Sequence, residues 1–182
     1  MRKTVKCFFI ISIVLLAGSC TFDYGGGGTP GEDMPDLIMI DVEYVRVRSA
    51  DPIAWFHADL AERYEKQGIM KLQNIVFEHY NEYGEEVSVY GKAGNAVVDI
   101  DSGDIFMNNG VRIEIMSEEI TLDTYQLEWK DEQRYLSAGE TNEVYIYRED
   151  GGSITGIGFS ADARRRTWEF SNRIRGTYIN EE

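Results

Sequence analysis

The chain has 182 residues, a length that supports one domain or at most two small ones. Its hydrophobic content of 43% is enough for a sizeable core and excludes wholesale disorder. The formal net charge of −14 argues against a nucleic-acid-binding protein, because phosphate contacts require clustered lysine and arginine. Two histidines and two cysteines leave little material for a transition-metal site or a disulfide scaffold.

The first nineteen residues have the pattern of a secretory signal. Three basic residues within the first six positions precede an apolar run over residues 7–17, and small residues follow. The run is too short to span a bilayer, which requires about 20 residues. The ending Leu16-Ala-Gly-Ser-Cys20 resembles a bacterial lipobox, which implies cleavage before Cys20 and acylation of that cysteine as a membrane anchor. An uncleaved anchor, or a simple signal with an incidental cysteine, is the alternative.

Residues 20–36 are predicted to form a flexible tether after the lipidated cysteine. They include four consecutive glycines at 25–28 and two of the three prolines of the chain. The glycines are not a phosphate-binding loop, because no Gly-Lys-Ser/Thr follows and no strand precedes them.

From residue 37 to residue 179, apolar and polar residues alternate along most of the chain. The alternation is clearest over residues 105–115, 143–147 and 168–176. Turn signals separate these runs, at Tyr83-Gly84, at residues 101–104 and at residues 149–152. The pattern predicts an all-β domain of short antiparallel strands, followed by an acidic tail at 180–182.

One segment, residues 51–67, also fits a helix. It has an N-cap, a proline at the first helical position and a glycine after its end. A repeat of Asn-x-Val/Ile, at Asn74, Asn109, Asn142 and Asn172, has spacings close to 33 residues and indicates a stack of hairpins. Phe56-His-Ala-Asp echoes Phe159-Ser-Ala-Asp, so the repeat favours a strand over 51–67.

Four features in order resemble the periplasmic domain of the LptC family of lipopolysaccharide-export proteins, and more distantly LptA and the periplasmic part of LptD. They are Phe56-x-Ala-Asp, Leu72-x-Asn-x-Val76, Gly156-x-Gly-Phe159 and the closing Trp168-x-Phe-x-Asn-x-Ile-x-Gly-x-Tyr178. The resemblance implies an open, twisted antiparallel β-jellyroll with an internal apolar groove, and no enzymatic activity or cofactor. It also implies three partners: lipopolysaccharide or a related glycolipid, an inner-membrane ABC transporter, and an LptA-like bridge protein that pairs through edge strands.

Strand alternation, taken with the family, predicts which residues line the groove. The candidates are Phe56, Ala58, Leu60, Val76, Val111, Ile113, Ile115, Leu122, Val144, Ile146, Phe159, Ala161, Phe170 and Ile174. The alternative is that these side chains fill a sandwich core and bind nothing.

The start of the chain departs from the family pattern. LptC proteins commonly keep an uncleaved transmembrane helix, whereas this chain has a candidate lipidation site at Cys20. A lipidated Cys20 would place the chain on the periplasmic side of the inner membrane or on the outer membrane.

Other polar clusters give weaker predictions. Arg164, Arg165 and Arg166 fall at an expected hairpin tip, where they are either solvated or contact a lipid headgroup or a partner. The acidic run at residues 99–104 resembles a calcium loop but has Gly110 where a bidentate glutamate is required, so a hairpin turn is expected. His57 and His79 have no third ligand, and no metal site is predicted.

Overall fold

The computed structural model describes residues 34–81 and 83–177, and contacts within the chain divide it into residues 1–33 and 34–182. The signal segment and Cys20 lie outside the described residues. The second unit is one antiparallel sheet of ten strands. The strands are β1 (Leu37–Arg48), β2 (Asp51–Tyr64), β3 (Ile69–Tyr80), β4 (Val87–Asp99), β5 (Ile105–Ile115), β6 (Ile120–Lys130), β7 (Tyr135–Ser137), β8 (Glu143–Arg148), β9 (Ser153–Asp162) and β10 (Thr167–Thr177).

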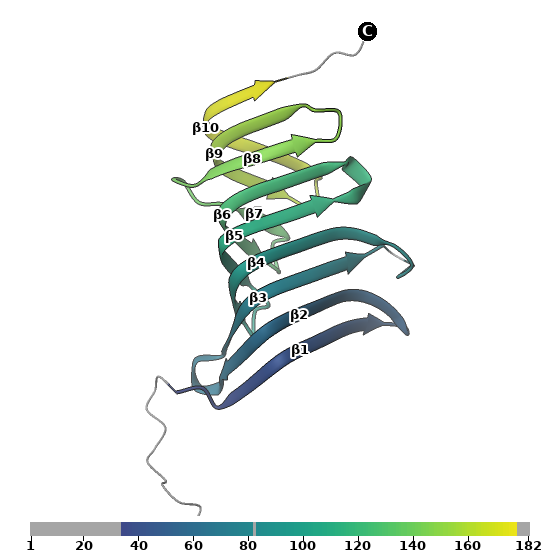
Figure 1. Cartoon of the computed structure of the whole chain (residues 1–182), viewed down its shortest axis with the longest axis vertical. Helices are drawn as coiled ribbons and strands as arrows, with labels where there is room; N and C mark the ends of the chain where they lie inside the picture. Colours follow the sequence, from purple (N-terminus) through teal and green to yellow (C-terminus); the bar gives the residue numbers. More distant parts are fainter. Residues whose placement is uncertain (1–33, 82, 178–182) are drawn as a thin grey trace, which may run out of the picture. The chain divides into compact units, whose positions relative to one another are not determined.

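Each strand pairs with the next one along the chain, so the strands stack in sequence order from β1 to β10 (Figure 1). The one departure lies between β6 and β9. There the short strands β7 and β8 share a single place, β7 pairing with one end of β6 and β9 and β8 with the other. The predicted all-β fold is therefore confirmed, and all ten strands belong to one continuous sheet. Among the strands that the structure describes, the outermost two, β1 and β10, each have one edge with no strand partner.

The ambiguous segment is a strand, as the repeat predicts. Residues 51–64 form β2, which pairs with β1 on one side and β3 on the other. Only Glu65–Gln67 are helical, as a single 3-10 turn that ends at Gly68 with φ +65°. A positive φ at this position favours glycine, which explains why the sequence carries an apparent helix-terminating glycine here.

Five of the ten strands change their buried face near the middle. Buried residues occur three positions apart at Ala58 and Ala61, at Leu72 and Ile75, at Ala93 and Ala96, at Thr124 and Leu127, and at Gly156 and Phe159. Simple alternation would separate them by an even number. Positive φ within strands, at Asp41, Asn74, Asn109, Gly158 and Arg173, bends the backbone. Asn74 and Gly158 lie inside two of the pairs, in β3 and β9, whereas β2, β4 and β6 reverse with no residue of positive φ between the pair. We call this line of bends the corner.

The corner divides the sheet into two arms, whose strands curve at one side of the stack in Figure 1. Arm A comprises residues 42–48, 51–58, 75–80, 87–93, 111–115, 120–124, 143–148 and 153–156. Arm B comprises residues 37–40, 61–64, 69–72, 96–99, 105–108, 127–130, 135–137, 159–162 and 167–170. Buried residues of both arms form one apolar cluster, which extends from Ala58 to Phe159. The core therefore lies inside the fold of the sheet.

Candidate functional site: an apolar interior between two free edges

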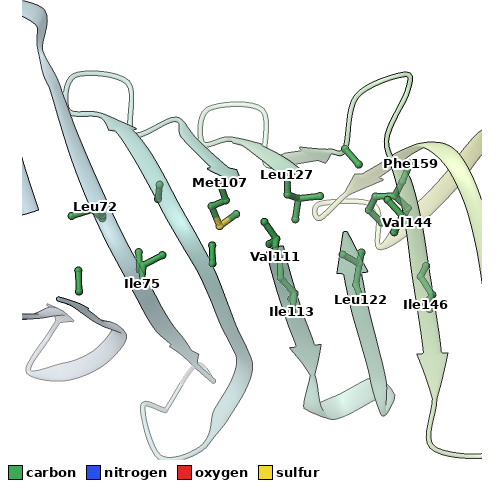
Figure 2. Close-up of a cluster of buried hydrophobic side chains, with 14 of the residues drawn as sticks. Leu72, Ile75, Met107, Val111, Ile113, Leu122, Leu127, Val144, Ile146 and Phe159 are labelled. Atoms are coloured by element: carbon green, nitrogen blue, oxygen red, sulfur yellow. The ribbon is translucent and has the colours of Figure 1, made fainter. Parts of the chain in front are cut away.

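Two uninterrupted rows of cross-strand partners line the interior. Directly paired residues on antiparallel strands point to the same face and lie within about 5.5 Å of each other. In arm B the row is Met39, Ala61, Leu72, Ala96, Met107 and Leu127. In arm A it is Tyr44, Phe56, Phe77, Gly91, Ile113, Leu122, Ile146 and Ile154. No member of these two deep rows is charged, so the lining has no charged residue from β1 to β6 in arm B and from β1 to β9 in arm A. Figure 2 shows the central members of both rows, among them Leu72, Met107 and Ile113.

The structure places most of the predicted groove residues on this inner face. Seven are buried: Ala58, Val111, Ile113, Leu122, Val144, Ile146 and Phe159. Four more are partly buried and pack against the core: Phe56, Ile115, Ala161 and Phe170. Whether they contact a lipid stays a prediction.

Three of the predicted groove residues lie elsewhere. Val76 is the partner of His57 and Lys92 on the outer face of arm A, and Leu60 is opposite Gln73 at the corner. Ile174 is 61% exposed on the edge strand β10. Val76 and Leu60 were assigned by carrying one alternation through the corner, where the alternation reverses, and that assignment of their face is wrong.

Sequence alternation missed much of the arm B lining and part of arm A. The missed buried residues are Ala61, Leu72, Ile75, Ala93, Ala96, Met107 and Leu127. A usable signal was present, because apolar residues three apart flank a residue that adopts positive φ easily. Leu72 and Ile75 flank Asn74, which has φ 51°, whereas Gly94 and Asn95 between Ala93 and Ala96 do not have positive φ. The signal therefore marks the corner in β3.

Small residues let aromatic rings lie flat against the inner wall. A Cβ atom at Gly91 would approach Cζ of Phe77 to 2.1 Å, and one at Gly156 would approach Cδ1 of Phe170 to 2.6 Å. Phe170 also packs against Phe159, with ring centroids 5.4 Å apart. These glycines are therefore needed for the position of the rings.

Both free edges carry apolar side chains. On β1, Leu37, Ile38, Ile40, Tyr44, Val45 and Val47 are all at least 47% exposed, and on β10 Trp168 is 42% exposed. An unpaired edge with apolar side chains is a ready site for pairing with another strand.

The arginine run lies in the turn between β9 and β10. Arg164, Arg165 and Arg166 are all exposed there. The Arg164 guanidinium donates a hydrogen bond to the backbone carbonyl of Glu132 in the turn between β6 and β7. Arg165 lies 3.5 Å from an Asp162 carboxylate oxygen. The run therefore joins two turns, and contact with a headgroup or partner stays a prediction.

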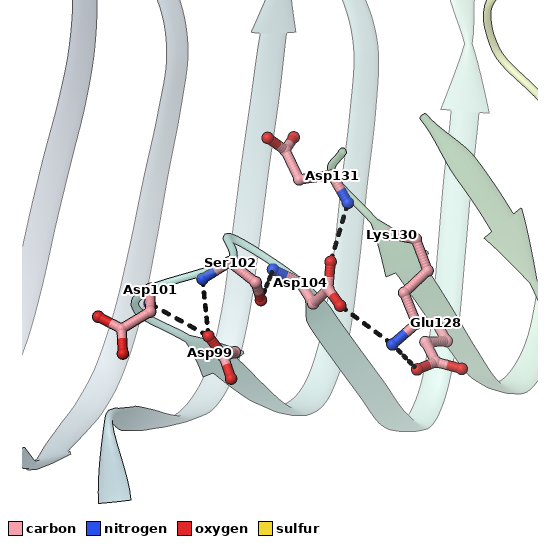
Figure 3. Close-up of polar contacts among 7 residues, drawn as sticks. All are labelled: Asp99, Asp101, Ser102, Asp104, Glu128, Lys130 and Asp131. Atoms are coloured by element: carbon pink, nitrogen blue, oxygen red, sulfur yellow. Dashed lines mark hydrogen bonds and ion pairs between the residues drawn. The ribbon is translucent and has the colours of Figure 1, made fainter. Parts of the chain in front are cut away.

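The acidic segment at residues 99–104 forms a hairpin turn in which the carboxylates of Asp99 and Asp104 have partners (Figure 3). Asp99 Oδ1 accepts backbone N–H groups of Asp101 and Ser102, at 3.1 and 2.8 Å. Asp104 lies 3.0 Å from Lys130 Nζ. These contacts lower the pKa of Asp99 and of Asp104 below the ordinary value, the hydrogen bonds contributing most. Among residues 34–81 and 83–177, no three metal-ligating side chains are grouped as a site.

The two histidines have opposite electrostatic environments. His57 Nε2 lies 2.8 Å from Asp41 Oδ1, and this hydrogen bond raises the imidazole pKa above 6.5. The pKa of His79 is lowered, first by burial and then by the charge of Arg134. The histidines lie on opposite faces of arm A. His57 is the partner of Val76 on the outer face, whereas His79 is two positions from Phe77 and shares its inner face.

No helix within the described part of the chain is long and apolar enough to cross a membrane.

Comparisons with known proteins agree with this geometry. An uncharacterized protein of Treponema pallidum (strain Nichols) is 24% identical over 140 residues, which cover 77% of this chain and 70% of that protein. The sheet is similar to the crystal structure of LptH, described as the LptA-homologous periplasmic component of the lipopolysaccharide transport device of Pseudomonas aeruginosa. That match has a TM-score of 0.53 at 14% identity and covers 70% of this chain and 95% of LptH, and it supports the β-jellyroll fold. A family model described as "Lipopolysaccharide-assembly, LptC-related" matches residues 9–179. The chain therefore belongs to the LptC-related family of lipopolysaccharide-assembly proteins.

Proposed function

We propose that this protein is a non-enzymatic periplasmic carrier in a lipopolysaccharide-transport bridge. It accepts lipopolysaccharide or a related glycolipid from an inner-membrane ABC transporter and passes it to a partner β-jellyroll toward the outer membrane. The observation that carries the proposal is the unbroken apolar lining between two unpaired strand edges. Family membership supports the same role, as does the transport device named for the structurally similar LptH.

The lining suits acyl chains because exposure of these chains is the main cost of moving a lipid through water. Each methylene removed from water contributes about 0.8 kcal/mol. A carrier must therefore keep apolar contact with the chains over its whole length, since a polar gap would expose them. The deep rows provide that contact on both arms from β1 to β6, and in arm A on to β9.

The free edges suit the junctions with neighbouring proteins. A strand added to β10 or β1 would extend both the backbone ladder and the apolar lining into the partner. We assign the β10 edge or the β1 edge to an LptA-like partner and the remaining edge to the transporter side. Acylated Cys20, through the tether at 20–36, would hold the domain at the outer leaflet of the inner membrane, with the outer membrane as the alternative.

One observation favours a second candidate function, that of an interaction lipoprotein with a filled core. Leu127 and Val144 are 0% exposed, so protein atoms cover that part of the interior. Phe56 and Phe77 towards β1, and Ile154 and Phe170 towards β10, are only partly buried, so the fully covered part of the interior lies between them.

Photo-crosslinking in cells tests the proposal. A photoreactive residue at Phe56 or Phe77 points inward, whereas one at the neighbouring Trp55 or Glu78 points outward, because Trp55 and Glu78 are cross-strand partners on the opposite face. Glycolipid adducts at the inward pair alone are expected. Adducts at neither pair, from folded protein, would favour the interaction lipoprotein.

A further inference from the structure

The outer face of the first two strands is apolar, although it lies on the side of the sheet away from the core. On β1, Ile38, Ile40 and Val45 are 56%, 79% and 50% exposed. They are next to Met39 and Tyr44, which belong to the deep rows, so their side chains point outward. Together with two cross-strand partners on β2 they form a group that we call the outer patch: Ile38, Ile40, Val45, Trp55 and Leu60. The outer patch lies at the β1 end of the stack (Figure 1).

The same outer rows are more polar farther along the stack. The row of direct partners that begins with Ile40 and Leu60 continues with amides on four strands, which are Gln73, Asn95, Asn108 and Gln126. The row that begins with Val45 and Trp55 continues with Glu78, Tyr90, Glu114, Thr121 and Tyr147. The row from Ile38 is mixed, with Glu62 and Lys71 before Val97 and Phe106. The outer patch is therefore a feature of β1 and β2 and not of the outer face as a whole.

The opposite edge strand differs from β1 on this face. On β10, the residues paired in outer rows include Glu169, opposite Ser160, and Arg175, opposite Thr155. The exposed Ile174 falls within a register shift of the β9–β10 ladder. A strand added to an edge pairs with the unpaired backbone groups and does not cover the outer face. At β1, pairing with another strand would therefore still leave the outer patch in water.

Four carboxylates lie on the same face of β1 and β2: Asp41, Glu43, Asp59 and Glu62. Glu43 is the partner of His57, and an Asp41 carboxylate oxygen lies 2.8 Å from His57 Nε2. Asp59 is two positions from His57 along β2, and Glu62 is opposite Ile38. The apolar side chains of the outer patch are thus surrounded by negative charge.

The arginines of these two strands are directed elsewhere. Arg46 and Arg63 are two positions from members of the deep rows and share their inner face, and Arg48 ends β1 opposite Asp51. On the outer face, lysines follow on β3 and β4, as partners of Glu62 and Val76. The outer face of β1 and β2 is therefore acidic as well as apolar.

We infer that the outer patch binds a basic, amphipathic segment of another protein, in addition to any strand that pairs with the edge of β1. Apolar side chains of that segment would cover Ile40 and Val45, and its lysines and arginines would face the four carboxylates. A second copy bound through the same patch would bring like charges together, and an anionic lipid surface would be repelled. This inference goes beyond the proposed function, because the contact requires no lipid cargo.

Site-specific photo-crosslinking of the full chain in its native cells tests the inference. A photoreactive residue replaces Ile40 or Val45, and matched controls replace Gln126 or Glu114, which lie in the same two rows on β6 and β5. Mass spectrometry then identifies the cross-linked peptide.

Charge reversal tests the chemistry of the contact. Each probe is repeated with Glu43→Lys/Glu62→Lys, which reverses two charges beside the outer patch. The matched control is Glu149→Lys/Glu169→Lys, which reverses two exposed charges at the other end of the stack. Unchanged near-ultraviolet circular dichroism of the purified variants verifies folding.

Probes at Ile40 and Val45 are expected to give adducts to one protein, at yields above both controls and through a peptide that is apolar and net positive. Glu43→Lys/Glu62→Lys should reduce these yields about fivefold, because like charges then face each other, and the control should not. A net acidic peptide, or yields that charge reversal leaves unchanged, would overturn the inference. Adducts to lipid, adducts to a second copy of the chain, or yields no higher than the controls would overturn it as well. Glycolipid adducts at Phe56 and Phe77 do not depend on these results, so the proposed function is tested separately.

Discussion

At the scale of single residues, the interior depends on glycine and alanine as much as on large apolar side chains. Gly91 has space for no Cβ because the Phe77 ring occupies that position, and Ala58, Ala61, Ala93 and Ala96 form the wall on either side of Leu72 and Ile75. Small residues on alternate strands leave room for larger ones between them. The same small residues would leave space for acyl chains if the arms separate.

The two histidines are expected to give opposite pH dependences of stability. The pKa of His57 is raised by Asp41, so its stabilising contribution is complete below pH 6.5 and is lost as the pH rises through the folded-state pKa. The pKa of His79 is lowered by burial, so protonation at pH below 6.5 costs stability. We predict that His57→Gln decreases the unfolding free energy at pH 5 relative to pH 8, and that His79→Gln increases it.

Urea unfolding at both pH values and low ionic strength checks this prediction. Asp41→Asn serves as the control for His57→Gln, because it removes the other half of the same 2.8 Å contact and should produce a change of the same sign. A shift in the same direction for both histidine variants would contradict the assignment of their environments.

At the scale of strands, the corner depends on residues that accept positive φ. Asn74 has φ 51°, and its side chain donates a hydrogen bond of 2.8 Å to Asp59 on β2. A β-branched residue in this conformation is strained by about 1–3 kcal/mol. We predict that Asn74→Val lowers the unfolding free energy by about 2 kcal/mol more than Asn74→Gly, which keeps the backbone conformation but loses the hydrogen bond.

Chemical denaturation of these variants measures the difference. The matched control is Gln73→Val, the adjacent exposed position on β3, where φ is not positive and valine suits a strand. It should change stability by less than about 0.5 kcal/mol. Equal effects of valine at positions 73 and 74 would mean that the positive φ is not what the strand requires.

The corner also explains which parts of the interior could be predicted from sequence. Alternation within one arm was sufficient for Ile113, Leu122 and Ile146, because each lies on a stretch without a bend. It failed for Val76, which follows Asn74, because one residue with positive φ reverses the face of every residue after it. The strand β2 was predicted correctly only through the repeat, since its local composition suits a helix and its pairing with β1 and β3 decides its conformation.

The alignment of Arg46 with His79 across β2 could not be predicted from sequence at all. The two residues are 33 positions apart, and no local pattern relates them. Both are cross-strand partners of Ala54, so their alignment follows from the register of two strand pairs. Register is set by burial of one face, so it is known only once the corner has been located.

At the scale of the whole sheet, each strand is hydrogen-bonded only to its neighbours in the stack. β1, β2 and β3 form no ladder with β8, β9 or β10. Stability in such a stack is approximately a sum of strand and nearest-neighbour terms, so unfolding is expected to begin at the end that is weakened. Unfolding from one end is expected because the strands are paired in series and the stack has two ends. A closed barrel has no end strand, because every strand in a barrel has two partners, so it would not unfold in this way.

Hydrogen exchange detected by mass spectrometry tests this expectation with one variant near each end of the stack. Ala61→Ser and Val144→Thr each place a hydroxyl at a position that is 0% exposed, so each should cost about 1–3 kcal/mol through an unsatisfied polar group. Ala61→Ser should accelerate exchange in β1 to β3 and leave β8 to β10 unchanged, and Val144→Thr should do the reverse. If both variants accelerate exchange throughout the sheet, the stack unfolds as one unit. Entry of cargo would then require the two arms to separate along the whole stack, because neither end could loosen alone.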